Sequence, residues 1–264
     1  MTEIRGSRIL LTGASGGIGQ AIARALAERG ATLILTGRRA EVLEPLAQQL
    51  GGRALAVDLA DRDAPEQLVR DAGDVDVLVN NAALPASGTL DDYSLDQVDR
   101  ALDVNLRAPI ALAKLLAEPM ERRGRGHLVF ISSLSGKSAQ PGGSLYSATK
   151  FGMRGFALGL REDLRDSGVG VSTVFPGFIR DAGMFAEAGV ELPKGVATRS
   201  PQDVAAGVVR AIEQNRSEVD VAPLSLRAGA AIAGLAPELA GNVSRRLGNA
   251  KISAQLAAGQ RDKR

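Results

Sequence analysis

The chain has 264 residues, of which 45% are hydrophobic and 23% are charged, and its formal net charge is +2. That length is enough to bury the core of one large domain, and the small, interspersed charge argues against a nucleic-acid partner. There is no cysteine, and His127 is the single histidine. Disulfides, thiol nucleophiles and zinc sites built on cysteine are therefore excluded. We expect no bound metal, and a structural role for His127 inside a strand.

The amino-terminal residues carry no targeting signal that can be recognised. Residues 1–8 are polar and lead straight into an apolar run, unlike a signal peptide. No apolar run in the chain approaches the roughly 20 residues that a membrane-spanning helix needs. The sequence therefore predicts a cytoplasmic protein.

Apolar runs alternate with helical patterns along the chain. Residues 8–12 are predicted to form the first strand, and residues 20–29 a helix that ends at Gly30. Further strands are predicted at residues 32–36, 54–58, 75–80, 127–132, 169–175 and 218–222. Alternation of this kind predicts an α/β fold, a doubly wound, Rossmann-type parallel sheet of seven strands with helices on both faces. We expect one catalytic domain over residues 1–223 and a helical extension over residues 224–264.

A glycine-rich turn follows the first predicted strand. Gly13, Gly17 and Gly19 have the spacing G-x-x-x-G-x-G, which differs from the G-x-G-x-x-G of the commonest dinucleotide fingerprint. Glycines let the backbone approach a pyrophosphate closely, and the N-terminus of the next helix offers free N–H groups to an anion. The turn predicts a phosphate-binding site; the alternative is a glycine turn without a ligand.

Tyr146 and Lys150 stand four residues apart in a segment that is predicted to be helical, so both side chains lie on one face of the helix. A nearby ammonium group favours the phenolate and lowers the pKa of a tyrosine from its usual value of about 10. We therefore expect Tyr146 to exchange a proton with a substrate oxygen near neutral pH. The alternative is an exposed aromatic side chain beside a surface lysine.

Several motifs in chain order make this sequence similar to a known family. They are Thr12 to Gly19, Asp58-Leu59, Asn80-Asn81-Ala82, Asn105, Ser133, Tyr146 with Lys150, and Pro176-Gly177. From about Arg8 to about Ala222 the chain resembles the classical short-chain dehydrogenases/reductases. The resemblance implies that Tyr146 is the general acid or base, that Ser133 donates a hydrogen bond to the substrate oxygen, that Lys150 lowers the pKa of Tyr146 and binds the nicotinamide ribose, and that Asn105 holds a water of a proton relay. Ser132 is the adjacent alternative to Ser133, and strand alternation points it to the opposite face.

The resemblance also implies a nicotinamide dinucleotide. The residues expected to bind it are Gly13, Ser15, Gly17, Ile18, Gly19, Arg38, Arg39, Asp58, Leu59, Asn81, Ala82, Tyr146, Lys150, Pro176, Gly177 and Ile179. After the second predicted strand, no carboxylate stands where the family uses one to hold the ribose hydroxyls; Gly37 and Arg38 stand there instead. Because a guanidinium is a bidentate partner for phosphate, Arg38 and Arg39 favour NADP over NAD. The alternative is that both arginines are solvated loop charges.

Two residues depart from the family pattern. Ala83 replaces the glycine of the N-N-A-G segment, and Asp181 replaces the threonine that bonds the nicotinamide carboxamide in the family. If Ala83 needs a positive φ, the cost is about 1 kcal/mol. Asp181 can accept a hydrogen bond from the carboxamide nitrogen but cannot donate one as a hydroxyl does, so the main chain of Ile179 is expected to contribute.

Residues 178–199 leave the regular pattern and are expected to form a lid over the substrate. The residues expected to line an apolar substrate wall are Leu84, Leu134, Leu145, Phe178, Met184 and Phe185. An apolar wall suits a small-molecule carbonyl compound or alcohol of apolar character. The alternative is that these side chains only pack the lid onto the body.

About forty residues follow Pro223, and they carry an apolar stripe at Leu239, Val243 and Leu247. A basic amphipathic segment can lie on a membrane surface or cover a partner subunit; packing on the chain itself or on a partner is favoured. The family resemblance implies a dimer interface made by the helices that carry Asn105 and Tyr146, and a homodimer or homotetramer is expected. An NADP-dependent carbonyl reductase or alcohol dehydrogenase is the leading hypothesis. A catalytically weak cofactor-binding sensor or scaffold and a membrane-surface protein are the alternatives.

Overall fold

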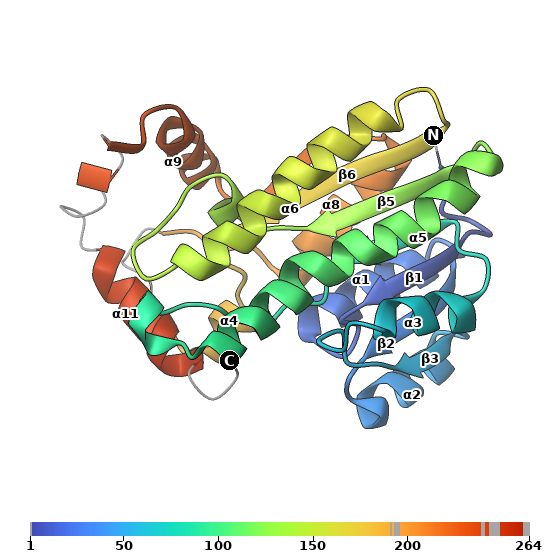
Figure 1. Cartoon of the computed structure of the whole chain (residues 1–264), viewed down its shortest axis with the longest axis horizontal. Coiled ribbons are helices and arrows are strands. Elements are labelled where there is room, and N and C mark those ends of the chain that lie inside the picture. The colour runs from blue at the N-terminus through green and yellow to red at the C-terminus, as the bar shows by residue number, and fades with distance from the viewer. Residues whose placement is uncertain (1, 191, 193–195, 239–240, 243–248, 261–264) are drawn as a thin grey trace.

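A computed structural model describes residues 2–190, 192, 196–238, 241–242 and 249–260. Its centre is a seven-stranded sheet in the order β3-β2-β1-β4-β5-β6-β7, and every neighbouring pair is parallel (Figure 1). The strands are β1 (Arg8–Thr12), β2 (Thr32–Gly37), β3 (Arg53–Ala56), β4 (Val77–Asn80), β5 (Gly126–Ile131), β6 (Val169–Pro176) and β7 (Glu218–Val221). The predicted fold class is confirmed.

The predicted strand boundaries agree with the observed ones to within two residues. The first helix differs more, because α1 (Gly17–Ala27) begins inside the glycine turn and not at Gln20. Its early start brings the free N–H groups of its first turn to the edge of the sheet. This arrangement strengthens the argument for an anion site.

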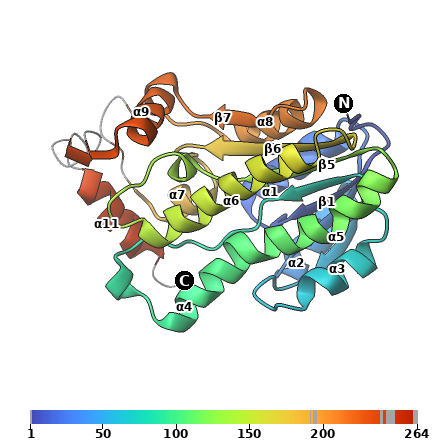
Figure 2. The ribbon, with the colours of Figure 1, turned by 45° about the horizontal axis from the view of Figure 1, so that its top comes forward.

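Helices cover both faces of the sheet, as the alternation of strands and helices predicts. One face is covered by α1, α2 (Ala40–Gln49) and α8 (Pro201–Glu213), and the other by α3 (Ala64–Ala72), α5 (Ala108–Arg122) and α6 (Ser144–Asp163) (Figure 2). Successive side chains of a strand enter opposite layers: Ile9 and Leu11 belong to the first core, and Leu10 belongs to the second. All three are fully buried, so the two cores hold the sheet rigid between them.

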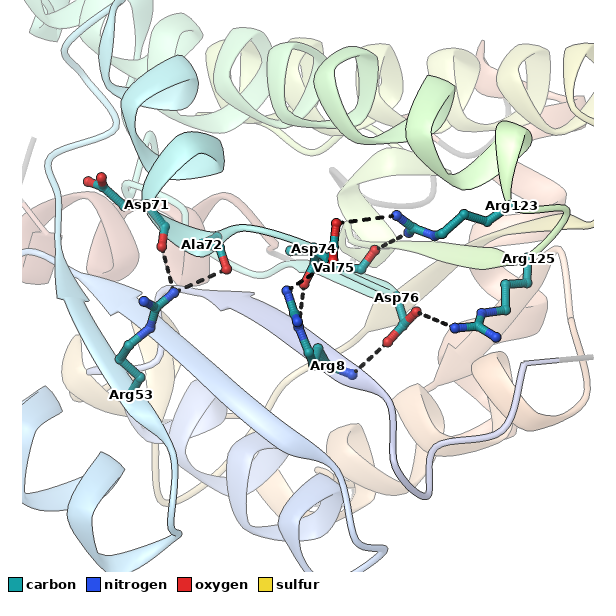
Figure 3. Close-up of polar contacts among 9 residues, drawn as sticks. All are labelled: Arg8, Arg53, Asp71, Ala72, Asp74, Val75, Asp76, Arg123 and Arg125. Atoms are coloured by element: carbon teal, nitrogen blue, oxygen red, sulfur yellow. Dashed lines mark hydrogen bonds and ion pairs between the residues drawn. The ribbon is translucent and has the colours of Figure 1, made fainter.

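Charged side chains link the segments at the edge of the sheet where the strands begin (Figure 3). Asp76 accepts a hydrogen bond from the backbone N–H of Arg8 at 3.0 Å and pairs with Arg125 at 3.7 Å. Arg8 also donates to the carbonyl of Asp74 at 2.6 Å, and Arg123 donates to the carbonyl of Val75 at 2.7 Å. These contacts join β1, the loop before β4 and the loop before β5. The opposite edge, where the strands end, is left for ligands.

The remaining elements lie at or near the carboxyl edge. They are η1 (Leu90–Asp92), α4 (Leu95–Leu102), η2 (Asp103–Arg107), η3 (Leu134–Gly136), α7 (Gly183–Glu187), α9 (Leu224–Leu235) and α11 (Asn249–Gln260). The helical character expected of the extension is found in α9 and α11, while its division from the rest at residue 223 stays a prediction. Leu239, Val243 and Leu247 lie outside the described residues. Of the helices that are described, none combines the length and apolar character needed to cross a bilayer.

Candidate active site

One large cavity opens at the carboxyl edge of the sheet. Its volume is 1940 Å³, roughly twice the upper end of about 1,000 Å³ that is usual for a pocket holding one small ligand. The glycine turn, the ends of β2, β4, β5 and β6, and the lid all line it. Every residue expected to bind a dinucleotide lies on its wall. The cavity therefore has space for a dinucleotide and a second ligand side by side.

The glycine turn is held against β4 by Thr12 and Asn81. The Thr12 hydroxyl accepts hydrogen bonds from the N–H groups of Asn81 and Ala82, both at 3.0 Å, and the Asn81 amide donates to the carbonyls of Thr12 and Gly13 at 3.1 Å. Gly13 has a φ of +67°, a conformation that glycine adopts without strain. A Cβ atom on Gly19 would lie 2.2 Å from the Gly13 carbonyl oxygen, so the turn can close this tightly only with glycine there.

The donors at this turn fit a dinucleotide phosphate. Gly16 caps α1 without a side-chain hydrogen bond, which leaves the N–H groups of the first turn available to an anion. Arg39 donates to the carbonyl of Ser15 at 2.6 Å, and Arg38 is exposed beside it on the cavity wall. Two guanidinium groups therefore stand at the end of β2 beside the turn.

Arg100 is a wall residue that the sequence motifs did not identify. Its guanidinium lies 3.2 Å from the carboxylate of Asp58, and both residues line the cavity. Arg100 belongs to α4 and lies 42 positions from Asp58 in the sequence. No local sequence pattern predicts this pair. The ion pair orients the Asp58 carboxylate on the cavity wall.

Ser133, Tyr146 and Lys150 converge at the end of β5. Tyr146 and Lys150 lie on one face of α6, and the Tyr146 phenol makes a hydrogen bond with the Ser133 side chain. The Lys150 ammonium donates to the carbonyl of Ile131 at 3.0 Å and lies 5.6 Å from the centroid of the Tyr146 ring. This arrangement places a proton donor and a second hydroxyl at one point of the cavity wall.

The pKa of Tyr146 differs from the sequence expectation. Lys150 was expected to lower it, but burial raises the pKa of Tyr146 to about 12, and only the hydrogen bond with Ser133 acts in the other direction. Burial also lowers the pKa of Lys150 to about 8. In a buried site the loss of hydration disfavours both charged groups, and here it is the largest cause of both shifts. The expected lowering is therefore wrong for this state of the protein.

Asn105 is fully buried in the π-helical turn η2. Its carbonyl oxygen accepts from the N–H of Leu84 at 2.6 Å, and its amide donates to the Leu84 carbonyl at 2.9 Å. The side chain is thus bonded to the main chain of a distant segment and not to its own helix. It fixes Leu84 on the cavity wall.

Ser132 and His127 have structural contacts, as expected. Ser132 lines the cavity as well, but its hydroxyl donates to the carbonyl of Lys150 at 3.1 Å. His127 is fully buried, its Nε2 atom lies 2.8 Å from the Ser172 hydroxyl, and burial lowers its pKa to about 3. A histidine that stays neutral inside a sheet does not serve as an acid–base group. Among the described residues, no cluster of three or more His, Asp or Glu side chains is placed to hold a metal ion.

Five of the six residues expected on the substrate wall line the cavity. They are Leu84, Leu134, Phe178, Met184 and Phe185. The Phe178 and Phe185 rings are in contact, with centroids 5.0 Å apart. The expected placement of Leu145 is wrong: it packs with Ala86 and Ala101 in a small separate core. One residue along a helix turns a side chain by about 100°, so the neighbour of Tyr146 faces away from the cavity.

The two departures from the family pattern have different outcomes. Asp181 and Asn215 are the only non-glycine residues of positive φ in the described part of the chain, so Ala83 carries no such strain. Asp181 has a φ of 68°, and its carboxylate is exposed and pairs with Arg180 at 3.3 Å. Asp181 is absent from the cavity wall, whereas Ile179 lies on it. The expectation that Asp181 accepts from the carboxamide does not fit this conformation.

Comparison with known proteins agrees with this geometry. Residues 7–191 match the short chain dehydrogenase family. The ketoacyl reductase HetN of Nostoc sp. (strain PCC 7120) is 37% identical over 230 residues, which cover 84% of this chain and 80% of that protein. Nodulation protein G of Rhizobium sp. (strain N33) is 41% identical over 188 residues, which cover 69% of this chain and 77% of that protein.

A solved structure is similar over most of its length. The short-chain dehydrogenase from Sphingobium yanoikuyae in complex with NADPH has a TM-score of 0.76 and 28% identity, and the match covers 88% of this chain and 96% of that one. The resemblance read from the motifs is confirmed. This chain belongs to the short-chain dehydrogenase family, and it is an oxidoreductase.

Proposed function

We propose that this protein is an NADP(H)-dependent oxidoreductase that interconverts a carbonyl group and an alcohol on an apolar small molecule. The observation that carries the proposal is the convergence of Ser133, Tyr146 and Lys150 on one point of the cavity wall. Three such groups beside a phosphate-binding turn are what proton transfer coupled to hydride transfer requires.

Each residue has a defined role in reduction. A nicotinamide dinucleotide would be held by the glycine turn and the end of β2 on the cavity wall, and when bound it would supply the hydride that reduction requires. Tyr146 donates its proton to the carbonyl oxygen. Ser133 donates a hydrogen bond to the same oxygen and stabilises the negative charge that develops there. Lys150 then stabilises the phenolate that remains, and Asn105 holds the wall beside them through Leu84. With a pKa of about 12, Tyr146 holds its proton at neutral pH and can donate it to the carbonyl oxygen.

Arg38 and Arg39 support NADP as the cofactor, with NAD as the alternative. Neither a carboxylate nor a bulky side chain stands at the end of β2 to reject a 2′-phosphate, because Gly37 occupies that position. The related structure from Sphingobium yanoikuyae holds NADPH. The apolar wall favours an apolar substrate, and the name of the Nostoc relative, a ketoacyl reductase, agrees with a carbonyl substrate.

A homodimer or homotetramer is part of the proposal. Phe151 and Leu158 lie seven residues apart on α6, and each is 40% exposed. Positions i and i+7 share a helix face, so these side chains offer an apolar surface to a second copy. Phe151→Glu is expected to shift the protein to a smaller species in sedimentation measurements, whereas an unchanged mass would place the interface elsewhere.

NADPH and NADH binding to the purified protein, followed by a panel of ketones and aldehydes, tests the function. Tyr146→Phe retains the ring and removes the proton, and it is expected to bind NADPH normally while turnover falls by about 10²- to 10⁴-fold. Tight NADPH binding without turnover on any carbonyl would favour the sensor alternative. A preference for NADH would contradict the role given to Arg38.

A further inference from the structure

The C-terminal extension forms a wall of the cavity. Side chains of α9, of α11 and of the segment between them line it, among them Leu226, Ile232, Ala233, Ser253, Leu256 and Gln260. No charged side chain of the described part of the extension is on this wall. This wall combines apolar side chains with the uncharged polar side chains of Ser225, Ser253 and Gln260, and it is built from residues outside the 7–191 segment that matches the family.

α11 is fastened to the lid helix α7 (Figure 2). The Gln260 amide donates to the carbonyl of Met184 at 3.2 Å, and Gln260 is only 3% exposed. At Gly259 the two segments come so close that a Cβ atom would lie 2.5 Å from the carbonyl oxygen of Ala188. At the other end of this contact, a Cβ atom on Gly142 would lie 3.4 Å from the Ser253 side chain. α11 thus connects the lid with the loop that precedes α6.

The base of the extension is fastened to the sheet. Arg227 in α9 pairs with Asp220 of β7 at 3.4 Å, and the same carboxylate accepts a hydrogen bond from Lys137 at 2.7 Å. Lys137 also pairs with Glu218 at 2.9 Å. Lys137, Glu218 and Asp220 are largely buried, so the pairs among them are screened less than a surface ion pair, whereas Arg227 is exposed. The network holds α9 at the mouth of the cavity.

We propose that α11 is a cap that determines substrate size, and that Leu256 contacts the far end of a carbonyl compound with an extended apolar chain. The inference rests on the proposed function, because the reacting carbonyl is placed at Tyr146. Met184, Phe185, Ile232 and Leu256 line the same cavity as Tyr146 and are all apolar. The chain of a long substrate held at Tyr146 therefore has apolar side chains to pack against. A short ketone reacts at Tyr146 without reaching α11.

The absence of tryptophan from the chain allows a direct test. Leu256→Trp places a single fluorophore on the cavity side of α11, and Gln255→Trp places one on its exposed side. The two proteins are titrated with NADPH and with methyl ketones from butanone to tridecanone. We expect Leu256→Trp to emit at shorter wavelength than Gln255→Trp, and its emission to respond to long ketones but not to butanone. The emission of Gln255→Trp is expected to respond neither to long ketones nor to butanone.

Turnover gives the second readout. In Leu256→Trp, kcat/KM is expected to fall about tenfold or more for the longest ketones and to stay within about twofold for butanone, since a change of one methylene already alters the fit to an apolar pocket by about this much. Leu256→Ala, which removes volume and does not threaten the fold, is expected to shift the preference to longer ketones. Gln255→Trp retains the wild-type length profile.

The outcomes separate the cap from the proposed function. Two results would overturn the proposal that α11 is a cap. One is solvent-like emission from both tryptophans, and the other is the same dependence of kcat/KM on ketone chain length in all variants. If the wild-type protein reduces no ketone while Leu256→Trp still shows blue-shifted emission that responds to long ketones, the cap stands and the reductase proposal fails.

Discussion

The Lys150 ammonium donates to the Ile131 carbonyl at 3.0 Å and lies 5.6 Å from the centroid of the Tyr146 ring. Both groups are buried, and burial shifts the two pKa values in opposite directions, to about 8 for Lys150 and about 12 for Tyr146. Near neutral pH the lysine is therefore largely charged and the phenol is neutral. Tyr146 can therefore donate a proton, and the charged Lys150 can then stabilise the phenolate.

The lowered pKa of Lys150 predicts a pH-dependent stability. Between about pH 8 and pH 10.5 the unfolded lysine holds its proton and the folded one releases it, so the free energy of unfolding rises with pH. The slope that Lys150 contributes is at most about 1.4 kcal/mol per pH unit. The cost of burying the charge is fully present below pH 8. Urea unfolding of the wild type and Lys150→Met at about pH 7, 8, 9 and 10 isolates this contribution.

Lys150→Met is expected to be more stable than the wild type at pH 7, with the difference shrinking as the pH approaches 10. Tyr146, whose pKa is raised, acts in the opposite sense only above about pH 10, outside this window. If the free energies of unfolding of the wild type and Lys150→Met run parallel from pH 7 to pH 10, Lys150 keeps its ordinary pKa.

The sequence predicted the sheet and most of the site because both depend on local patterns. A short apolar run and the glycine spacing define β1 and the phosphate turn, and the i, i+4 rule places Tyr146 and Lys150 together. The family motifs then identify Ser133. Each of these signals lies within a few residues or within a fixed order along the chain.

Contacts between distant segments could not be predicted in this way. Arg100 reaches Asp58 from another helix, and Gln260 reaches Met184 across 76 positions. The predicted lowering of the Tyr146 pKa was wrong for a related reason. The spacing shows that a charge is near, but the balance between attraction and desolvation depends on burial by the whole fold. Leu145 shows that one helical position is enough to move a side chain from a cavity to a core.

Gly19→Ala is predicted to destabilise the protein before any cofactor is added. Its Cβ would lie 2.2 Å from the Gly13 carbonyl oxygen, and relieving that overlap requires a backbone shift that costs about 1–3 kcal/mol. Gly16→Ala is the matched control, since its Cβ would meet the same oxygen at 3.6 Å, an ordinary contact. Urea unfolding of the apo proteins is the measurement. Equal losses in the two variants would show that the turn adapts to a methyl group at either position.

Arg38→Gln is predicted to weaken NADPH binding without affecting NADH. A hydrogen bond to a charged group contributes about 1.5–3 kcal/mol, which corresponds to a loss of about 10- to 100-fold in affinity. Arg210→Gln, on the exposed side of α8, controls for the change in net charge. Fluorescence titrations with both cofactors at low and high salt are the measurement, and the NADPH preference of the wild type is expected to shrink at high salt. Equal weakening for both cofactors would place Arg38 away from the 2′-phosphate.

Asp181→Thr, which restores the family residue, is predicted to be harmful. Asp181 has a φ of 68°, and a β-branched side chain tolerates that region poorly, so we expect a loss of about 1–2 kcal/mol in the free energy of unfolding. NADPH affinity is expected to stay unchanged or to fall, because the side chain at this position is exposed and lies outside the cavity wall. Asp181→Asn, a residue that accepts positive φ more readily, is the control and should match the wild type in both measurements. Tighter NADPH binding by Asp181→Thr would show instead that this segment rearranges, so that position 181 reaches the nicotinamide when the cofactor is bound.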